Sequence, residues 1–138
     1  MNQKYKYQMV RAGLVTALLF FSITASAASC AGGAGTTITG VDNQTYCQSK
    51  IQMNWWSAFA WCEGAGLTLV SLEDCNGSNG TITGDASCPN FKEKGSGSVW
   101  TSSVPDGSNA YYIDLSSGTV SSYDRLGSWN GIKAALCK

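Results

Sequence analysis

Six cysteines constrain this chain more than any other feature, and all of them lie at or after position 30. An even number of cysteines is typical of an exported domain held together by disulfides. The metal-site alternative requires histidine or closely spaced cysteine pairs. The chain has no histidine and no Cys-x-x-Cys pair. We therefore expect three disulfides and neither a metal nor another cofactor, and spacing alone leaves the pairing open.

The N-terminal segment has the pattern of a secretory signal. Three basic residues among the first eleven precede an apolar run at 14–25, and small residues of Ala-x-Ala type follow. We expect a signal peptide at 1–27, with cleavage one residue later as the alternative, and one mature domain at 28–138. Two further alternatives are an uncleaved anchor, disfavoured by the short apolar run, and a lipoprotein attached at Cys30, which would leave an odd number of cysteines.

Charge narrows the class of partner. From residue 28 onward the chain has six Lys or Arg against nine Asp or Glu, a net charge of −3. A mildly acidic domain without a basic cluster does not attract nucleic acid or, after signal cleavage, an anionic membrane. The signal and the cysteines predict a secreted or surface-exposed protein, with the periplasm as an alternative, and the style of the signal favours a bacterial source.

One aromatic-rich segment, 54–66, predicts the main helix. At about 100° per residue, Trp55, Phe59 and Cys62 share one stripe, which we assign to the core. Asn54 is placed to cap the start of the helix. A Gly-x-Gly pair ends it, because glycine tolerates the left-handed backbone of a helix C-terminus.

The rest of the mature chain predicts short strands and loops. A turn at 40–46 joins two strands before the helix, and an extended segment follows the helix at 67–72. One helix among short strands makes the fold class α+β. The later elements are a polar loop at 75–97, a strand at 98–104, a turn at 105–109, a hairpin at 110–124 and a hairpin signal at Asn130-Gly131.

Several motifs, in order, carry a family resemblance. The pattern W-x-x-A-x-x-x-C at 55–62, followed by Gly66–Leu72, resembles the first helix and next strand of C-type lectin-like domains. Trp100, the hairpin after it and the closing Ala134–Cys137 are similar to the later strands of that family. The resemblance covers about 45–138. It implies a compact, long-loop-less fold of the kind seen in bacterial adhesins, with one main helix packed on small antiparallel sheets.

The resemblance also implies how the cysteines pair. In the family the helix cysteine bonds to the cysteine of the last strand. Here that pair is Cys62–Cys137. With it assigned, we expect the other four cysteines to form Cys30–Cys47 and Cys75–Cys88.

The calcium site of the sugar-binding family members is not expected here. Those members use Glu-Pro-Asn or Gln-Pro-Asp together with Trp-Asn-Asp, and Ca²⁺ needs about six to eight oxygen ligands. The nearest counterparts are Val104-Pro105-Asp106 and Trp129-Asn130-Gly131. The first lacks the amide or carboxylate before proline, and the second has glycine in place of the carboxylate.

Catalysis has little support from the residues. The chain lacks histidine, the commonest general base, and cysteines held in disulfides are not nucleophiles. The adjacent carboxylates Glu73 and Asp74 would point to opposite faces of an extended chain. We therefore expect a non-enzymatic recognition or adhesion module that binds a protein or glycan independently of calcium. The alternative is a structural subunit of a bacterial surface assembly such as a pilus, whose partner would be a second copy of this chain. A small secreted hydrolase is a less favoured alternative.

Candidate ligand contacts are side chains that the core does not need. Two tryptophans lie off the helix stripe, Tyr112 alternates with the apolar residues of its strand, and the remaining candidates lie in turns. We expect the binding surface at the loop 75–97 and the turns at 105–109 and 129–130. The candidate residues are Trp56, Trp61, Asp106, Tyr112, Trp129 and Asn130.

Overall fold

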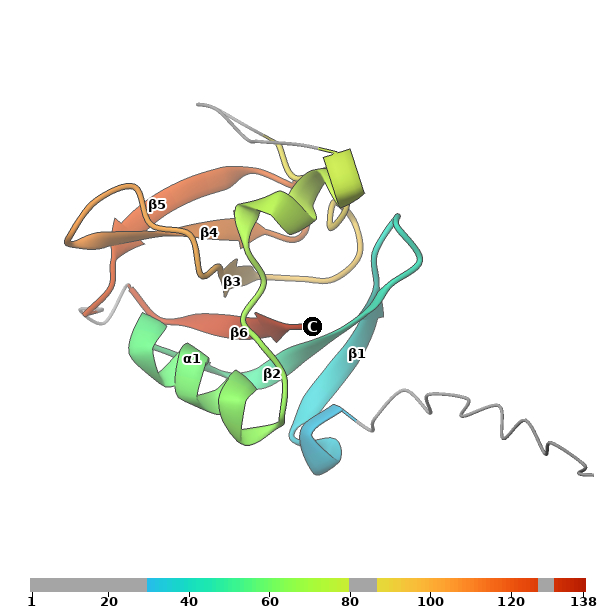
Figure 1. The fold of residues 1–138 in the computed structure, drawn as a ribbon, viewed down its shortest axis with the longest axis horizontal. Helices are drawn as coiled ribbons and strands as arrows, with labels where there is room; N and C mark the ends of the chain where they lie inside the picture. The colour runs from blue at the N-terminus through green and yellow to red at the C-terminus, as the bar shows by residue number, and fades with distance from the viewer. Residues whose placement is uncertain (1–29, 80–86, 127–130) are drawn as a thin grey trace, which may run out of the picture.

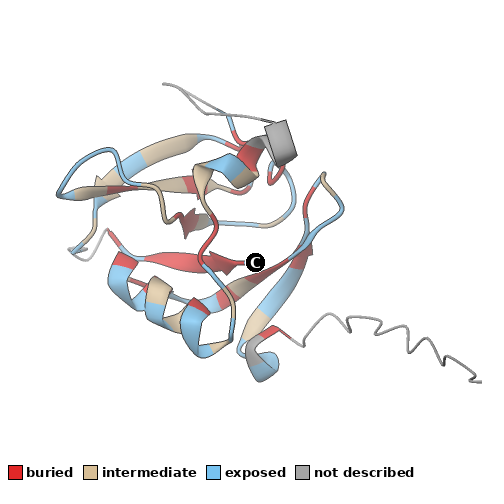
Figure 2. Cartoon of the chain, viewed as in Figure 1, coloured by how far each residue is buried: buried red, intermediate tan, exposed pale blue. Residues whose placement is uncertain are grey.

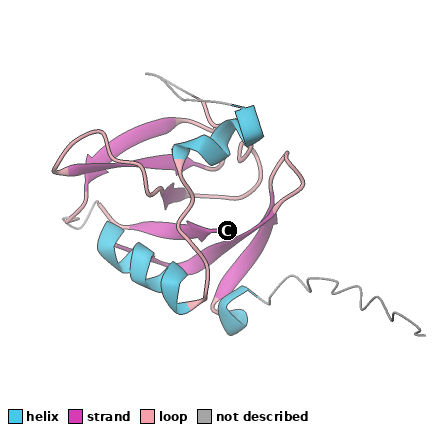
Figure 3. Ribbon diagram, in the orientation of Figure 1, coloured by secondary structure: helices cyan, strands magenta, loops and turns pink. Residues whose placement is uncertain are grey.

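The computed structural model describes residues 30–79, 87–126 and 131–138. The expected signal peptide at 1–27 and two ligand candidates, Trp129 and Asn130, lie outside these residues. Within the described part, no helix is long and apolar enough to cross a membrane. The elements, shown in Figure 1 and Figure 3, are the 3-10 segment η1 (Cys30–Gly33), β1 (Gly35–Thr39), β2 (Thr45–Met53), α1 (Trp55–Gly64), the 3-10 segment η2 (Leu72–Asn79), β3 (Ser98–Trp100), β4 (Asn109–Asp114), β5 (Val120–Asp124) and β6 (Lys133–Cys137).

The described strands form one mixed sheet in the order β1-β2-β6-β3-β4-β5. β6 runs antiparallel to β2 and parallel to β3. The predicted α+β class is confirmed, but the expected separate antiparallel sheets are replaced by this single mixed sheet. The reason lies in β6, whose five residues are all buried. A strand buried on both faces takes a central position, where it joins β2 to β3.

The sequence signal at Asn130-Gly131 predicted a hairpin, and this prediction is wrong. The strands on either side of it, β5 and β6, are not paired, because β3 and β4 lie between them in the sheet. Burial of the apolar residues of β6 on both faces outweighs the local turn preference. A two-residue hairpin would have placed β6 at the open edge next to β5.

Helix α1 begins and ends where the sequence predicts. The Asn54 side chain accepts a hydrogen bond from the backbone N–H of Ser57 at 2.8 Å, which caps the first turn. After the helix, Gly66 has φ +72°, which favours glycine. The predicted stripe is the side that packs on the sheet. Its buried members are Trp55, Ala58 and Cys62, and Phe59 packs against the same core.

The sheet separates two apolar cores, and its central strands are the most buried part of the molecule (Figure 2). Ala135 lies in the core shared with α1, and its neighbour Leu136 lies in the other core. The alternation of side chains along β6 therefore supplies both cores at once.

All three expected disulfides are confirmed. Cys62–Cys137 joins α1 to the last strand, Cys30–Cys47 joins η1 to β2, and Cys75–Cys88 anchors η2 to the segment before β3. No cysteine of the chain is free. Disulfides of this kind fit an oxidising compartment outside the cytosol.

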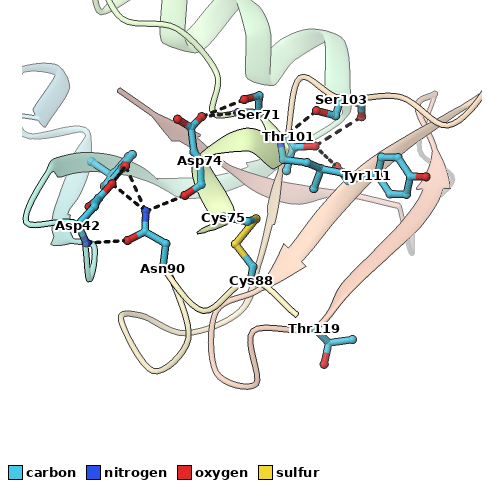
Figure 4. The surroundings of a disulfide bond; sticks show 12 residues. Asp42, Ser71, Asp74, Cys75, Cys88, Asn90, Thr101, Ser103, Tyr111 and Thr119 are labelled. Atoms are coloured by element: carbon cyan, nitrogen blue, oxygen red, sulfur yellow. Dashed lines mark hydrogen bonds between the residues drawn. A yellow bond between two sulfur atoms is a disulfide. The ribbon is translucent and has the colours of Figure 1, made fainter. Parts of the chain in front are cut away.

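A polar network holds the β1–β2 turn to the segment stapled by Cys75–Cys88 (Figure 4). The buried Asn90 amide nitrogen donates to a carboxylate oxygen of Asp42 at 2.9 Å and to the backbone oxygen of Asp74 at 2.7 Å. Its amide oxygen accepts from the Asp42 N–H at 3.0 Å. The hydrogen-bonded Asn90 side chain therefore links three segments of the chain.

This network predicts a loss of stability in acid. Burial raises the pKa of the Asp42 carboxyl, but hydrogen bonds from the Tyr46 hydroxyl, the Gln44 N–H and the Asn90 amide outweigh burial, so the pKa lies below its ordinary value of 3.8. A carboxyl with a lowered folded pKa stabilises the fold above its unfolded pKa, and that contribution disappears as pH falls through the folded pKa. Thermal melts below about pH 4 should therefore show a smaller acid loss for Asp42→Asn than for the wild type. Equal losses would contradict this role of the carboxylate.

Candidate functional site

The start of α1 and the end of β5 meet around Arg125. The Trp55 N–H donates to the Arg125 backbone oxygen at 3.3 Å. The guanidinium carbon of Arg125 lies 5.0 Å from the ring centre of Trp55 and 5.5 Å from that of Trp56. Both distances permit cation–π attraction.

The two tryptophans of this contact differ in exposure. The side chain of Trp55 is buried, and its indole N–H donates to the Thr101 backbone oxygen at 2.7 Å. Trp56 is 55% exposed, although its ring is held edge-on against Trp55 with centroids 4.7 Å apart. A large aromatic surface therefore faces solvent from a fixed position in the first turn of the helix.

The turn at 105–109 lies beside this contact. The Arg125 N–H donates to the Ser108 backbone oxygen at 3.0 Å. Figure 1 shows this turn, between β3 and β4, at the same side of the molecule as the start of α1 and the end of β5. We call this region, made of Trp56, Arg125, the exposed Leu126 and the turn 105–109, the α1–β5 end.

The Asp106 carboxylate is used inside its own turn. It accepts hydrogen bonds from the Ser108 N–H at 2.7 Å, the Asn109 N–H at 2.8 Å and the Asn109 side-chain amide at 2.9 Å. The Asn109 side chain first, then the two backbone N–H groups and the charge of Arg125, lower the pKa of Asp106. Within the described ranges, no three His, Cys, Asp or Glu side chains are grouped to hold a metal ion.

A second cation lies on the helix side of the sheet. Lys133, at the start of β6, is 7% exposed, and its amine lies 4.1 Å from the ring centre of Tyr112, 5.0 Å from that of Tyr123 and 5.2 Å from that of Trp100. Burial lowers the pKa of this amine. The only ion pair among the described residues joins Lys138 to Asp74, so no described carboxylate neutralises Lys133.

The structure brings together some of the predicted ligand residues. Trp56 and Asp106 both lie at the α1–β5 end. Tyr112 is half-buried beneath the amine of Lys133. Trp61 is half-buried in the last part of α1, where it packs against the core, and it is about 140° around the helix from Trp56. Trp129 and Asn130 lie outside the described residues.

The predicted surface included the loop 75–97, of which the described residues around Ser87 and Cys88 lie at the other end of the β4–β5 hairpin. Ser87 bridges to Thr119 in the turn of that hairpin, whereas Asn109 pairs with Asp124 at its open end. β4 has six residues and spans about 17 Å between these ends. One compact ligand therefore does not contact both regions.

Sequence reasoning missed Arg125 and Lys133. A signal for each was present: Arg125 continues the alternation that places Tyr123 on the helix side, and Lys133 opens a strand that is otherwise apolar. A lysine at a buried position of a central strand is unusual enough to mark as functional or strained.

A separate hollow lies over β1 and β2. It has a volume of about 510 Å³, and its walls are mainly polar side chains and backbone of β1, β2 and residues 94–98. It arises where β2 bulges between Gln48 and Gln52. At this bulge the Ser49 hydroxyl accepts a hydrogen bond from the Ala135 N–H at 2.8 Å. This bond replaces the backbone pairing that the bulge interrupts.

Comparison with known proteins assigns the chain to no family: no protein-family model matches the sequence, and no curated protein matches it.

Proposed function

We propose that this protein is a secreted or surface-exposed, non-catalytic recognition module with a compact C-type lectin-like fold, which binds a glycan or protein without calcium at the α1–β5 end. The observation that carries the proposal is Trp56, a 55% exposed indole held rigidly against Trp55 and Arg125. Rigid aromatic surface next to an arginine is typical of the residues that dominate recognition interfaces.

The fold assignment rests on the helix motif and the long-range disulfide. Trp55 and Cys62 occupy the buried side of α1, as the family pattern implies. Cys62 bonds to Cys137 of the last strand, which is the pairing that the resemblance predicts. The proposed adhesin-like function rests on the same resemblance to C-type lectin-like domains.

Binding without catalysis is supported by the hydrogen bonds and the ion pair that already engage the acidic side chains. The Asp74 carboxylate accepts from the N–H and hydroxyl of Ser71 and pairs with Lys138. It therefore holds the end of the chain to η2, and does not form an acid–base pair with Glu73. Asp106 is likewise engaged by its own turn, which favours recognition without Ca²⁺.

Replacing Trp56 by alanine is expected to weaken binding by at least about 10-fold, because the substitution removes the exposed ring from the centre of the proposed surface. The measurement is binding of the labelled mature protein to an array of glycans and extracellular proteins, with and without EDTA. Val41→Ala is the matched control, because Val41 is 62% exposed and lies in the β1–β2 turn. Binding abolished by EDTA, or lowered equally by both variants, would contradict the proposal.

The structural-subunit alternative is favoured by a different feature. β1 and β5 form the two outer edges of the described sheet, and unpaired strand edges are able to pair with a second copy. Sedimentation of the mature protein tests this alternative. A monomer at high concentration counts against it, and a concentration-dependent assembly unaffected by Trp56→Ala favours it.

A further inference from the structure

The buried lysine of β6 is not explained by the fold. All five residues of β6 are buried, and the four that follow Lys133 are apolar or disulfide-bonded. A charge in such surroundings is costly to the fold unless it is paired, hydrogen-bonded or able to reach water. Among the described residues no buried side-chain nitrogen lacks a hydrogen-bond partner, so the stem of Lys133 is buried while its amine stays open to solvent and to a ligand.

The described surroundings compensate the charge of Lys133 only in part. The rings of Trp100, Tyr112 and Tyr123 surround the amine at 4.1–5.2 Å, which provides cation–π attraction. No hydrogen bond or carboxylate within 4.0 Å reaches the amine from residues 30–79, 87–126 and 131–138.

The amine lies on the same side of the sheet as the α1–β5 end. Tyr123, which it contacts, packs against the core beneath α1. Arg125, two residues further on, contacts Trp55 of that core, and two residues of a strand span about 7 Å. Lys133 itself pairs with Met53, two residues before Trp55, so a ligand seated at the α1–β5 end lies near this lysine.

We propose that the Lys133 amine binds the carboxylate of an acidic sugar, such as a uronic or sialic acid unit, in the glycan that the α1–β5 end recognises. This inference rests on the proposed function. A carboxylate supplies the ion-pair partner that the described residues do not give Lys133, and charge-assisted hydrogen bonds are the strong ones. The exposed Trp56 indole gives a sugar ring an apolar face to pack on, which favours a glycan over an acidic peptide.

Calorimetric titration of the mature protein tests this with matched probes. The probes are galacturonate, glucuronate and sialic acid oligosaccharides, each beside its carboxyl-reduced neutral form, and an oligoglutamate peptide. We expect at least one acidic sugar to bind about 10- to 100-fold tighter than its reduced form. Equal affinities, no binding of any acidic sugar, or tighter binding of oligoglutamate would overturn the inference.

Variants separate this inference from the proposed function. Lys133→Met should remove the preference for the acidic form, while its melting temperature stays close to that of the wild type, because methionine keeps the buried stem and the amine has no ion-pair partner among the described residues to lose. Lys92→Met, at an exposed lysine, should leave the preference unchanged. Trp56→Ala should weaken the acidic and reduced probes alike. A preference retained in Lys133→Met would overturn the inference and leave the proposed function intact.

A measurement on the wild type covers the case in which Lys133→Met does not fold. With lysines carrying ¹³C-methyl groups, the Lys133 resonance should shift on adding the acidic probe and stay in place with the reduced probe. A resonance that responds to neither, while the probe binds, would show that the carboxylate is held elsewhere.

Discussion

Replacing Cys62 and Cys137 together by alanine is expected to lower the free energy of unfolding by about 4 kcal/mol. The two residues are 75 positions apart, and the entropy that a cross-link removes from the unfolded chain grows with the length of the closed loop. This bond also fastens α1 to the central strand β6. Since small domains have only about 5–15 kcal/mol of stability, the variant should be largely unfolded at moderate denaturant concentrations.

The Cys75–Cys88 bond provides the matched control. Its cysteines are 13 positions apart, so the same model gives a smaller loss of about 3 kcal/mol for the double alanine variant. Guanidinium denaturation followed by circular dichroism measures both. If the two double variants lost the same stability, or the shorter loop mattered more, the tie between α1 and β6 would not have the central role described here.

Trp100→Ala is expected to cost about 3–5 kcal/mol. The Trp100 side chain is fully buried at the centre of the sheet. It contacts Tyr112 edge-on, with centroids 6.3 Å apart, and it forms one wall around Lys133. Removing it creates a cavity that the disulfide-linked core around it is not free to fill by collapse.

The conservative variant Trp100→Phe isolates the polar part of that effect. The indole N–H donates to the Met53 backbone oxygen at 2.9 Å, and phenylalanine leaves this buried acceptor without its partner at a cost of about 1–3 kcal/mol. Equilibrium unfolding should therefore rank the wild type above Trp100→Phe and Trp100→Phe above Trp100→Ala. A Trp100→Ala variant as stable as the wild type would contradict the assignment of Trp100 to the core.

Local sequence signals predicted the local structure well. Asn54 caps the helix, and the alternation of Tyr112 with Ile113 correctly predicts that the two side chains lie on opposite faces of the sheet. The disulfide pairs were obtained from the family resemblance, because spacing leaves the pairing open. These features depend on neighbours in sequence or on a known pattern.

The long-range arrangement was predicted less well. The turn preference of Asn130-Gly131 carries no information about where β6 inserts, which depends on burial against residues far away in sequence. The strand predicted at 98–104 is only Ser98–Trp100, because the backbone after Trp100 bonds to Val70 and to Tyr111 as separate contacts. Such pairings appear only when the whole sheet is assembled.

The candidate site was predicted in part for the same reason. Trp56 was identified because the helix stripe does not need it. Arg125 and Lys133 were not, because their significance depends on aromatic rings contributed by α1, β3, β4 and β5. The sequence marks Lys133 as a charge at the start of an apolar strand, but it gives no indication that three aromatic side chains surround the amine.

The most direct test of the account is a map of the bound surface. The ¹⁵N-labelled mature protein is titrated in EDTA with the tightest array ligand, and amide and indole resonances are followed by NMR. We predict that the largest shifts occur at the Trp56 indole, at Arg125 and in the turn 105–109. Shifts confined to residues 87–97 or to the hollow over β1 and β2 would contradict the assignment of the α1–β5 end as the recognition surface.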